Sequence, residues 1–463
     1  MQYLSTRGRA PELGFSDAVL TGLAADGGLY LPREWPQLTP AEIANYANRP
    51  YAEVACDIIS RFTGGEIPAA DLRRIAQEAY GTFRHPSVAP LVEIGPGHFI
   101  LELFHGPTLA FKDVAMQFLA RLMDHILSAR GAHCTIVAAT SGDTGSAAIE
   151  AFRGRDNIDI FIMHPEGRTS EVQRRQMTTV LDDNVHNVAV QGTFDDCQRL
   201  LKAMFANQRF RERVRLSGVN SINWGRIVAQ IVYYVTAAVS LGSPHRDVTF
   251  VVPTGNFGDV LAGYVAKRMG LPIRTLAIAT NSNDILARTL ATGRYEVGTV
   301  APTISPSMDI QVSSNFERLL FEAMDRDAAG LQGMMDGLAQ SGSFTVPAAA
   351  LAAIRRDFVA ARASEAETAD AIRRTLAETG YLLDPHTAVG VHVAAPLIGR
   401  DVPVVTLATA HPAKFPAAVK AAAGIEPHLP LWLADLYGRS ERFDVLGNDQ
   451  GAIEAYVTTR TRA

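Results

Sequence analysis

Short apolar runs rich in β-branched residues alternate with amphipathic helical patterns from about residue 91 onwards. Each run is followed by a loop and then by a helix-like segment. The clearest strand candidates are Thr135–Ala139, Ile158–Met163, Val185–Val190, Val248–Val252, Ile273–Ala279 and Val402–Leu407. This alternation is typical of βαβ units built around a parallel sheet. It predicts an α/β protein in which helices cover both faces of each sheet.

A chain of 463 residues is long enough for two or three domains. Residues 1–90 mix turn signals with helical patterns such as Ile43–Phe62, so we expect a separate N-terminal unit or a lid. Residues 91–240 are predicted to form a smaller α/β domain and residues 241–463 a larger one. Between about 315 and 381 the strand signals stop and Ala-, Arg- and Glu-rich helical patterns follow. We interpret that stretch as a helical insertion and a candidate oligomer surface.

The composition excludes several classes of protein. A net charge of -5, with arginines scattered among acids, gives no basic field for nucleic acid. Cys56, Cys134 and Cys197 form no CxxC pair, so neither a disulfide framework nor a zinc site is expected and a reducing cytoplasm fits. The first residues lack the layout of a signal peptide. The most apolar stretch, Ile227–Gly242, is shorter than the ~20 residues of a membrane span, which favours a buried helix.

Lysine is rare in this chain: five of the 43 basic side chains are lysines and the rest are arginines. One of the five, Lys112, lies in the turn His105–Asp113 beside Phe111. Apolar residues spaced by four in Val114–Leu127 predict a helix that begins near Lys112. Apolar surroundings lower the pKa of an amine and leave it free to attack a carbonyl, which a guanidinium cannot do. A lysine at a helix start can also be an ordinary surface residue.

Two segments have the form of a strand, a glycine-rich polar loop and a helix. The first contains Thr140–Ser146 and the second contains Pro253–Asp259. Such loops direct backbone N–H groups and a helix N-terminus at one point, where phosphate or carboxylate can bind. Neither loop fits the fingerprint for ATP or for a dinucleotide. A tight turn with a capping side chain is the alternative for each loop.

The lysine and the two loops together fit pyridoxal 5'-phosphate. That cofactor needs an amine for a Schiff base, a helix N-terminus for its phosphate, a partner for its ring nitrogen and a second anion site for the substrate. Thr409, at the end of the run Val404–Thr409, is the candidate partner of the ring nitrogen. A hydroxyl at that position leaves the nitrogen largely unprotonated.

Several runs in this order resemble threonine synthase, of the pyridoxal-phosphate fold type II family (tryptophan synthase β-like), in its longer class. The matching runs are Phe104–Asp113, Ala139–Ser146, Asn220–Gln230, Pro253–Gly263, Ser313–Phe316 and Thr406–Phe415, with Tyr3–Gly8 and Asp26–Tyr30 near the N-terminus. The resemblance implies two three-layer αβα domains, with Lys112 as the Schiff-base lysine and Thr409 at the ring nitrogen. It also implies a set of residues around the cofactor phosphate: Gly255, Asn256, Phe257, Gly258 and Asp259. Asp143 stands where relatives usually carry asparagine, so its role is left open.

The resemblance implies a cytoplasmic lyase that converts O-phospho-L-homoserine and water into L-threonine and phosphate, the last step of threonine biosynthesis. The candidate substrate-binding residues are Thr140, Ser141, Gly142, Thr144, Arg226 and Lys414. Each has an alternative: Ser141 and Thr144 as helix caps, Arg226 as the partner of an acid, and Lys414 as a structural cation. We expect no metal site, and we expect the protein to be a monomer or a homodimer.

Two other functions stay open at this point. One is another fold type II lyase, such as a threonine deaminase or a β-replacement enzyme. Those relatives lack the long N-terminal unit, and Phe257 is unlike the small residues of their phosphate loops. The other is a non-catalytic relative, which loss of Lys112 or of the phosphate loop would favour. Both features are present in this chain.

Overall fold

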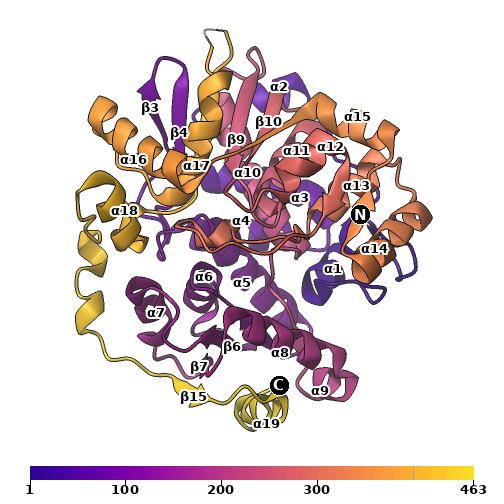
Figure 1. The fold of residues 1–463 in the computed structure, drawn as a ribbon. Coiled ribbons are helices and arrows are strands. Elements are labelled where there is room, and N and C mark those ends of the chain that lie inside the picture. Colours follow the sequence, from indigo (N-terminus) through magenta and orange to yellow (C-terminus); the bar gives the residue numbers. More distant parts are fainter. Residues whose placement is uncertain (400) are drawn as a thin grey trace.

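The larger of two central sheets has six strands in the order β13-β10-β9-β14-β4-β3 (Figure 1). The computed structural model describes residues 1–399 and 401–463. All neighbouring strands of this sheet are parallel except β3 and β4. The strands are β3 (Leu91–Gly95), β4 (His98–Glu102), β9 (Val248–Pro253), β10 (Ile273–Thr280), β13 (Phe358–Arg362) and β14 (Val404–Ala408).

The smaller sheet has five strands, all parallel, in the order β15-β7-β6-β5-β8. The strands are β5 (Cys134–Ala139), β6 (Ile158–Pro165), β7 (Val185–Val190), β8 (Leu216–Ser217) and β15 (Asp444–Leu446). All six strands expected from the sequence are confirmed, with ends that differ by no more than two residues. Burial on both faces explains their continuous apolar character.

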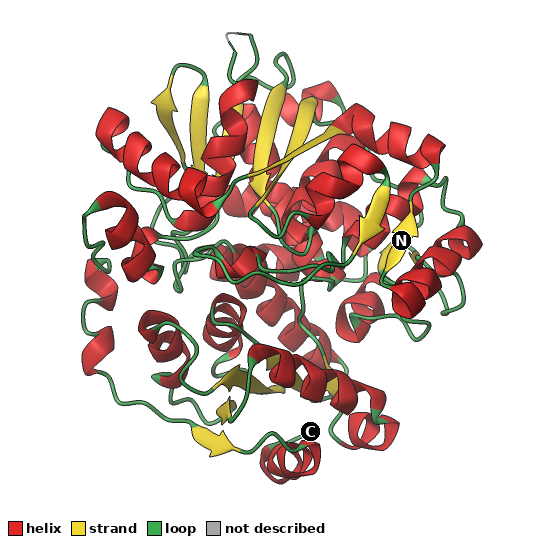
Figure 2. Cartoon of the chain, in the orientation of Figure 1, coloured by secondary structure: helices red, strands yellow, loops and turns green. Residues whose placement is uncertain are grey.

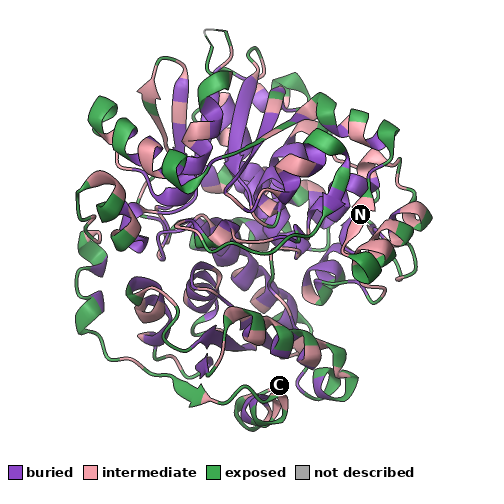
Figure 3. Ribbon diagram, viewed as in Figure 1, coloured by how far each residue is buried: buried purple, intermediate pink, exposed green. Residues whose placement is uncertain are grey.

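Helices cover both faces of the two sheets (Figure 2). They are α1 (Phe15–Thr21), α2 (Pro40–Ala44), α3 (Tyr51–Thr63), α4 (Ala69–Tyr80), α5 (Lys112–Ala129), α6 (Asp143–Phe152), α7 (Glu171–Thr178), α8 (Phe194–Ala206), α9 (Gln208–Arg213), α10 (Trp224–Ser240), α11 (Gly258–Arg268), α12 (Ile285–Thr292), α13 (Phe316–Ala323), α14 (Ala328–Ser341), α15 (Ala348–Asp357), α16 (Glu365–Thr379), α17 (Pro385–Ala394), α18 (Pro416–Ala423) and α19 (Gln450–Arg460). The core strands and α10 are buried (Figure 3). Within the described residues, every helix is too short or too polar to cross a membrane.

The N-terminal unit packs tightly on α5 and α10, which favours a packed unit over a lid, the two alternatives that we expected. Its strands β1 (Tyr3–Ser5) and β2 (Tyr30–Pro32) form a small antiparallel sheet. The rings of Tyr3 and Phe62 each lie 6.0 Å from the indole of Trp224 on α10. One hydrophobic cluster joins the unit to the rest of the molecule. We expected one helix over Ile43–Phe62, but the start of that helix is wrong. The structure has two helices there, α2 and α3, and Pro50 lies between them.

The helical insertion at about 315–381 contains two strands that the sequence analysis missed. The strand β12 (Ser343–Thr345) pairs with β11 (Arg294–Glu296), and β13 forms an edge of the larger sheet. Alanines give β13 the composition of a helix. Its pairing with β10 decides its conformation, because strand formation depends on a neighbouring strand rather than on local preference.

The two sheets group the strands differently from the domain boundary that we placed at residue 240. Strands β3 and β4 precede that boundary but belong to the larger sheet. Strand β15 follows it but belongs to the smaller sheet, and α19 packs on α8. The chain after α18 therefore crosses back from one lobe to the other (Figure 1). The division into residues 1–90, 91–240 and 241–463 remains a proposal that these crossings modify.

Candidate active site

The loops that follow β5, β9 and β14 come together near the start of α5. Lys112 is the first residue of α5, as the spacing of apolar residues predicted. The backbone N–H of Phe111 donates to the carbonyl oxygen of Thr409 over 2.8 Å, which joins this turn to the end of β14. Parallel strands place their carboxyl ends at one edge, where ligands of α/β proteins bind.

Lys112 is a buried amine that approaches the carboxylate of Asp143. The residue is 8% exposed, and its Nζ lies 3.7 Å from Oδ2 of Asp143. Nζ also lies 4.8 Å from the centre of the Phe111 ring. Burial lowers the pKa of Lys112, Asp143 opposes that change, and the positive charges of Arg226 and Lys414 add to it. A lowered pKa gives Lys112 more of the free amine that nucleophilic attack needs.

Asp143, whose role the sequence left open, bridges two lysines. Its Oδ1 lies 3.0 Å from Nζ of Lys414 and accepts a hydrogen bond from Nε2 of Gln173 over 2.9 Å. Its Oδ2 accepts from Oγ of Ser307 over 3.2 Å. Burial raises the pKa of Asp143, but Lys414 and Lys112 together hold it well below its usual range. The carboxyl group is therefore an anion that both lysines stabilise.

Lys414 is fully buried, and its ammonium group has three acceptors within the protein. In addition to Asp143, Nζ donates to the carbonyl oxygen of Thr108 over 2.7 Å and to Oε1 of Gln176 over 2.9 Å. A lysine has three N–H donors, so all of them are engaged. This arrangement supports the structural alternative for Lys414 over a direct contact with substrate phosphate.

Gln173 and Gln176 contact the charged side chains of this site and were missed by the sequence analysis. They lie three residues apart on α7 and therefore on one face of that helix. That spacing was the only available signal, because their partners Asp143 and Lys414 are far away in the sequence. Ser307 gave no signal at all.

The loop between β9 and α11 brings backbone close to backbone. A Cβ atom on Gly255 would lie 2.8 Å from the carbonyl oxygen of Ser307, which requires glycine. Phe257 has a left-handed conformation (φ 63°), an uncommon one for a residue with a side chain, and it caps α11. Its ring is buried 5.4 Å from that of Phe316, so Phe257 can face a ligand only with its backbone. Asn256 is exposed.

Asp259 does not point towards this loop but across to α10. Its Oδ1 accepts hydrogen bonds from the hydroxyl groups of Tyr233 over 2.5 Å and Tyr234 over 2.9 Å. Burial raises the pKa of Asp259 to about 6. A carboxyl group would repel phosphate, and this one has other partners. Its side chain is therefore a brace between α10 and α11 rather than a phosphate ligand.

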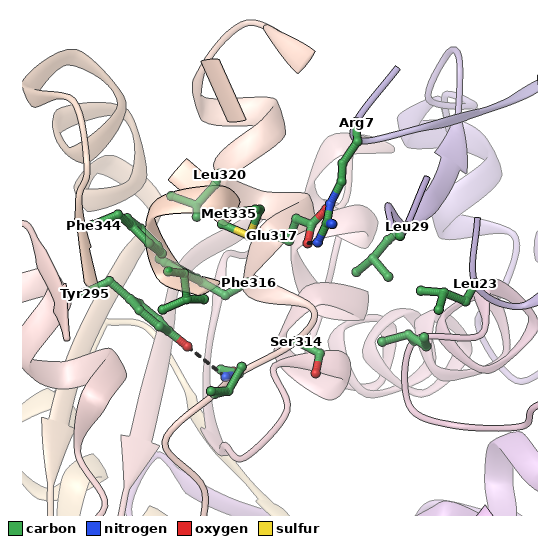
Figure 4. Close-up of a pocket in the computed structure, with 15 residues that line it drawn as sticks. Arg7, Leu23, Leu29, Tyr295, Ser314, Phe316, Glu317, Leu320, Met335 and Phe344 are labelled. Carbon is green, nitrogen blue, oxygen red and sulfur yellow. Dashed lines mark hydrogen bonds and ion pairs between the residues drawn. The ribbon is translucent and has the colours of Figure 1, made fainter. Parts of the chain in front are cut away.

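A cavity of about 230 Å³ lies behind the phosphate loop, between the N-terminal unit and α13 and α14 (Figure 4). Apolar side chains and the ion pair between Arg7 and Glu317 line it. Ser313 connects this cavity to the loop: its Oγ donates to the carbonyl oxygen of Gly255 over 2.7 Å, and its N–H donates to Tyr295 over 2.8 Å. Ser313 therefore fixes the loop between β9 and α11 from the side of this cavity.

Arg226 is a buried cation beside Lys112 that has no carboxylate partner among the described residues. The residue is 3% exposed, and the only hydrogen bond of its side chain there is from Nη1 to the carbonyl oxygen of Val219 over 3.3 Å. Its Nε is buried without an acceptor. Burial lowers its pKa to about 10. An unpaired buried cation is costly, so the site fits an anionic group such as a phosphate.

The loop after β5 places four of the predicted substrate-binding residues around Asp143. Oγ1 of Thr140 accepts the N–H groups of Gly142 and Gly145, each over 2.9 Å, so Thr140 is the residue that fixes this loop. Gly142 has φ 146°, and a Cβ atom there would meet Gln173 at 2.4 Å. The side chains of Ser141 and Thr144 are half-buried and make no hydrogen bond within the described residues, so the helix-cap alternative finds no support for them.

The side chain of Thr409 is available to a ligand. The residue is 6% exposed, and its hydroxyl group makes no hydrogen bond in the part of the chain that the structure describes. Only its carbonyl oxygen is engaged, by Phe111. The buried amine, the backbone cradle before α11, the unpaired guanidinium and this hydroxyl together fit pyridoxal phosphate. Across residues 1–399 and 401–463 no group of three or more His, Cys, Asp or Glu is placed to hold a metal ion.

Comparisons with known proteins agree with this set of features. The family model described as pyridoxal-phosphate dependent enzyme matches residues 87–333. Models described as threonine synthase N terminus and threonine synthase, C-terminal match residues 2–80 and 387–457. Threonine synthase from Pseudomonas aeruginosa is 53% identical over 460 residues, which cover 99% of this chain and 98% of that protein. The chain belongs to the threonine synthase family.

Solved structures of threonine synthases match along the whole chain. A crystal structure of the enzyme from Brucella melitensis with bound PLP is 62% identical, covers 100% of both chains and has a TM-score of 0.98. The yeast threonine synthase structure is 40% identical, covers 99% of this chain and 98% of that one, and has a TM-score of 0.94. The fold is therefore the fold type II fold of pyridoxal-phosphate enzymes, as expected from the sequence.

Proposed function

We propose that this chain catalyses the threonine synthase reaction, the conversion of O-phospho-L-homoserine and water into L-threonine and phosphate. The observation that carries the proposal is the buried amine of Lys112, which faces Asp143 where three strand-end loops converge. The reaction breaks the bond from Cγ to the phosphate oxygen and adds water at Cβ. It needs a base that removes a proton and later returns one.

Lys112 would hold the cofactor through its amine, and the backbone of residues 255–258 at the N-terminus of α11 would hold the cofactor phosphate. The Thr409 hydroxyl group would donate to the ring nitrogen. When bound, pyridoxal phosphate stores the electron pair that is left behind when a proton leaves the substrate. Asp259 stabilises this part of the chain, because its carboxylate accepts hydrogen bonds from Tyr233 and Tyr234 and so holds the start of α11 against α10.

Lys112, once released from the cofactor, is the group placed to move protons. Its Nζ would take the proton from Cα of the substrate and later one from Cβ, and would return one proton to Cγ after the phosphate leaves and one to Cα. The hydroxyl groups of Ser141 and Thr144, with the loop at Thr140 and Gly142, would hold the substrate. Because the three cysteines are unpaired, we also propose a reducing compartment, the cytoplasm.

Turnover on O-phospho-L-homoserine tests this function. We expect the purified protein to absorb visible light and to release phosphate and threonine in equal amounts. Protein that binds the cofactor but makes no threonine from this substrate would point to another fold type II lyase, and L-threonine and O-acetylserine are the substrates to try next. Protein that binds no cofactor would point to a non-catalytic relative.

Substitution of Arg226 tests whether its guanidinium binds the cofactor phosphate or the substrate phosphate. We expect Arg226→Met to weaken binding of one of them by roughly 10- to 100-fold, because a hydrogen bond to a charged group contributes about 1.5–3 kcal/mol. Titration of the cofactor by absorbance and the KM for O-phospho-L-homoserine separate the two cases. If neither affinity changes, Arg226 is not an anion ligand. Exposed Arg356 offers the matched control Arg356→Met.

A further inference from the structure

We propose that Lys414 is a positioning residue for Lys112: it holds the Asp143 carboxylate to itself, so that the Lys112 amine remains free to react. This inference rests on the proposed function, because it gives a task to a lysine that touches neither cofactor nor substrate. Of the five lysines in the chain, only Lys112 and Lys414 are buried, and both approach this one carboxylate.

The distances to Asp143 are unequal. Lys414 lies 3.0 Å from Oδ1, whereas Lys112 lies 3.7 Å from Oδ2. The shorter contact allows a charge-assisted hydrogen bond and the longer one does not. Gln173 and Ser307 donate to the two oxygens of the same carboxylate, so it is restrained from turning towards Lys112.

Lys414 is itself fixed in place. It donates to Gln176 on α7 and to the carbonyl oxygen of Thr108, which lies in the turn that carries Lys112. Thr108 also donates, through its N–H and its hydroxyl group, to the buried carboxylate of Asp113. The segment that leads to α5 is therefore tied to Lys414, and a change at position 414 is felt directly beside Lys112.

The consequence for Lys112 is electrostatic. A carboxylate in close contact with an amine stabilises the ammonium form, which cannot attack a carbonyl. By engaging Asp143, Lys414 weakens this effect, and its own positive charge also disfavours a second one nearby. The other charges that act on Lys112 are Arg226 and, below the phosphate loop, Asp259; His386, paired with Asp384 over 2.9 Å, acts on Asp143. None of these four residues is changed in the variants that test the proposal.

The test is a double-mutant cycle on the full-length chain after removal of the cofactor. The four proteins are wild type, Lys414→Met, Asp143→Asn and the double variant. Each reacts with formaldehyde and cyanoborohydride across a range of pH, and mass spectrometry follows the peptide that contains Lys112. Because the amine must be deprotonated, the midpoint of labelling against pH reports its pKa. Lys202, Lys267 and Lys420 lie on separate peptides and serve as internal references.

We expect Lys414→Met to raise the midpoint of Lys112 labelling by about 1–2 pH units, because the Asp143 carboxylate then acts on Lys112 without the opposing charge of Lys414. In the Asp143→Asn background the same substitution removes only a like charge, so the rise should be less than half as large. The control Lys420→Met, at an exposed lysine paired with Glu426, should leave the midpoint unchanged.

Equal rises in the two backgrounds would overturn the proposal, because Lys414 would then act only as a like charge. No rise in either background would overturn it as well. Circular dichroism checks that each variant folds. If Lys414→Met does not, Lys414→Gln takes its place, since its amide can still donate to Thr108. The labelling uses no substrate, so its outcome is independent of whether the chain makes threonine.

Discussion

Lys112→Ala and Lys112→Arg should both lose turnover by at least about 10²–10⁴-fold, together with the visible absorption of the bound cofactor. Alanine removes the amine, whereas arginine keeps a positive charge beside Asp143 but cannot form the bond to the cofactor. The pair of variants therefore separates the need for an amine from the need for a charge. Release of phosphate and threonine, measured beside the absorption spectrum, gives the result.

Neither substitution should unfold the protein, because Asp143 keeps its contacts with Lys414, Gln173 and Ser307. Thermal unfolding checks this point. Lys202→Ala, at an exposed lysine on α8, is the matched control and should retain full activity. If Lys112→Arg kept the activity of wild type, the amine would not be the essential group and the proposed role of Lys112 would be wrong.

Arg318→Met should lower the free energy of unfolding by about 2–5 kcal/mol, because it leaves buried carbonyl oxygens without donors at about 1–3 kcal/mol each. Arg318 is 1% exposed and lies over the indole of Trp224 at 5.5 Å. It donates to the carbonyl oxygens of Tyr30 over 2.8 Å and Ile222 over 2.7 Å. The side chain thus joins the N-terminal unit, the segment before α10 and α13.

The midpoint of urea unfolding measures this effect, and unfolding should begin with the N-terminal unit. Arg356→Met removes an exposed arginine of α15 and should change stability by no more than about 0.5 kcal/mol. An equally small effect of Arg318→Met would mean that water replaces the guanidinium, and that the junction is less tightly packed than the structure indicates. Cofactor affinity should fall along with stability, because Arg318 also contacts Asn315, whose amide donates to the phosphate loop at Asn256 over 3.0 Å.

The elements that the sequence predicted correctly are those whose signal is local. The six strands are mostly buried runs, and the start of α5 at Lys112 follows from apolar residues spaced by four. The errors arise where a local pattern predicts a helix and a proline or a neighbouring strand prevents it. Pro50 begins α3 in the middle of a pattern that predicted one helix, and alanines in β13 resemble a helix until β10 pairs with them.

At the active site, the sequence indicated residues that would act through the backbone or through a single reactive group, and these assignments remain proposals. Lys112, Gly255 and Thr409 follow strand ends or begin a helix, and their neighbours in sequence already indicate their chemistry. Residues that act through a side-chain partner were harder to assign. Asp259 and Lys414 were expected to touch phosphate, but each has protein partners far away in the sequence.

The sequence by itself determined the α/β class and indicated the candidate cofactor lysine and the two loops, because periodicity, turn residues and rare lysines are properties of short segments. Only the tertiary structure decided that Asp143 bridges two lysines, that Arg226 is a buried cation beside Lys112, and that β15 returns to the smaller sheet. The physical reason is that a buried charge is stabilised by whichever groups the fold brings within a few ångströms, and that choice depends on the order of strands rather than on the order of residues.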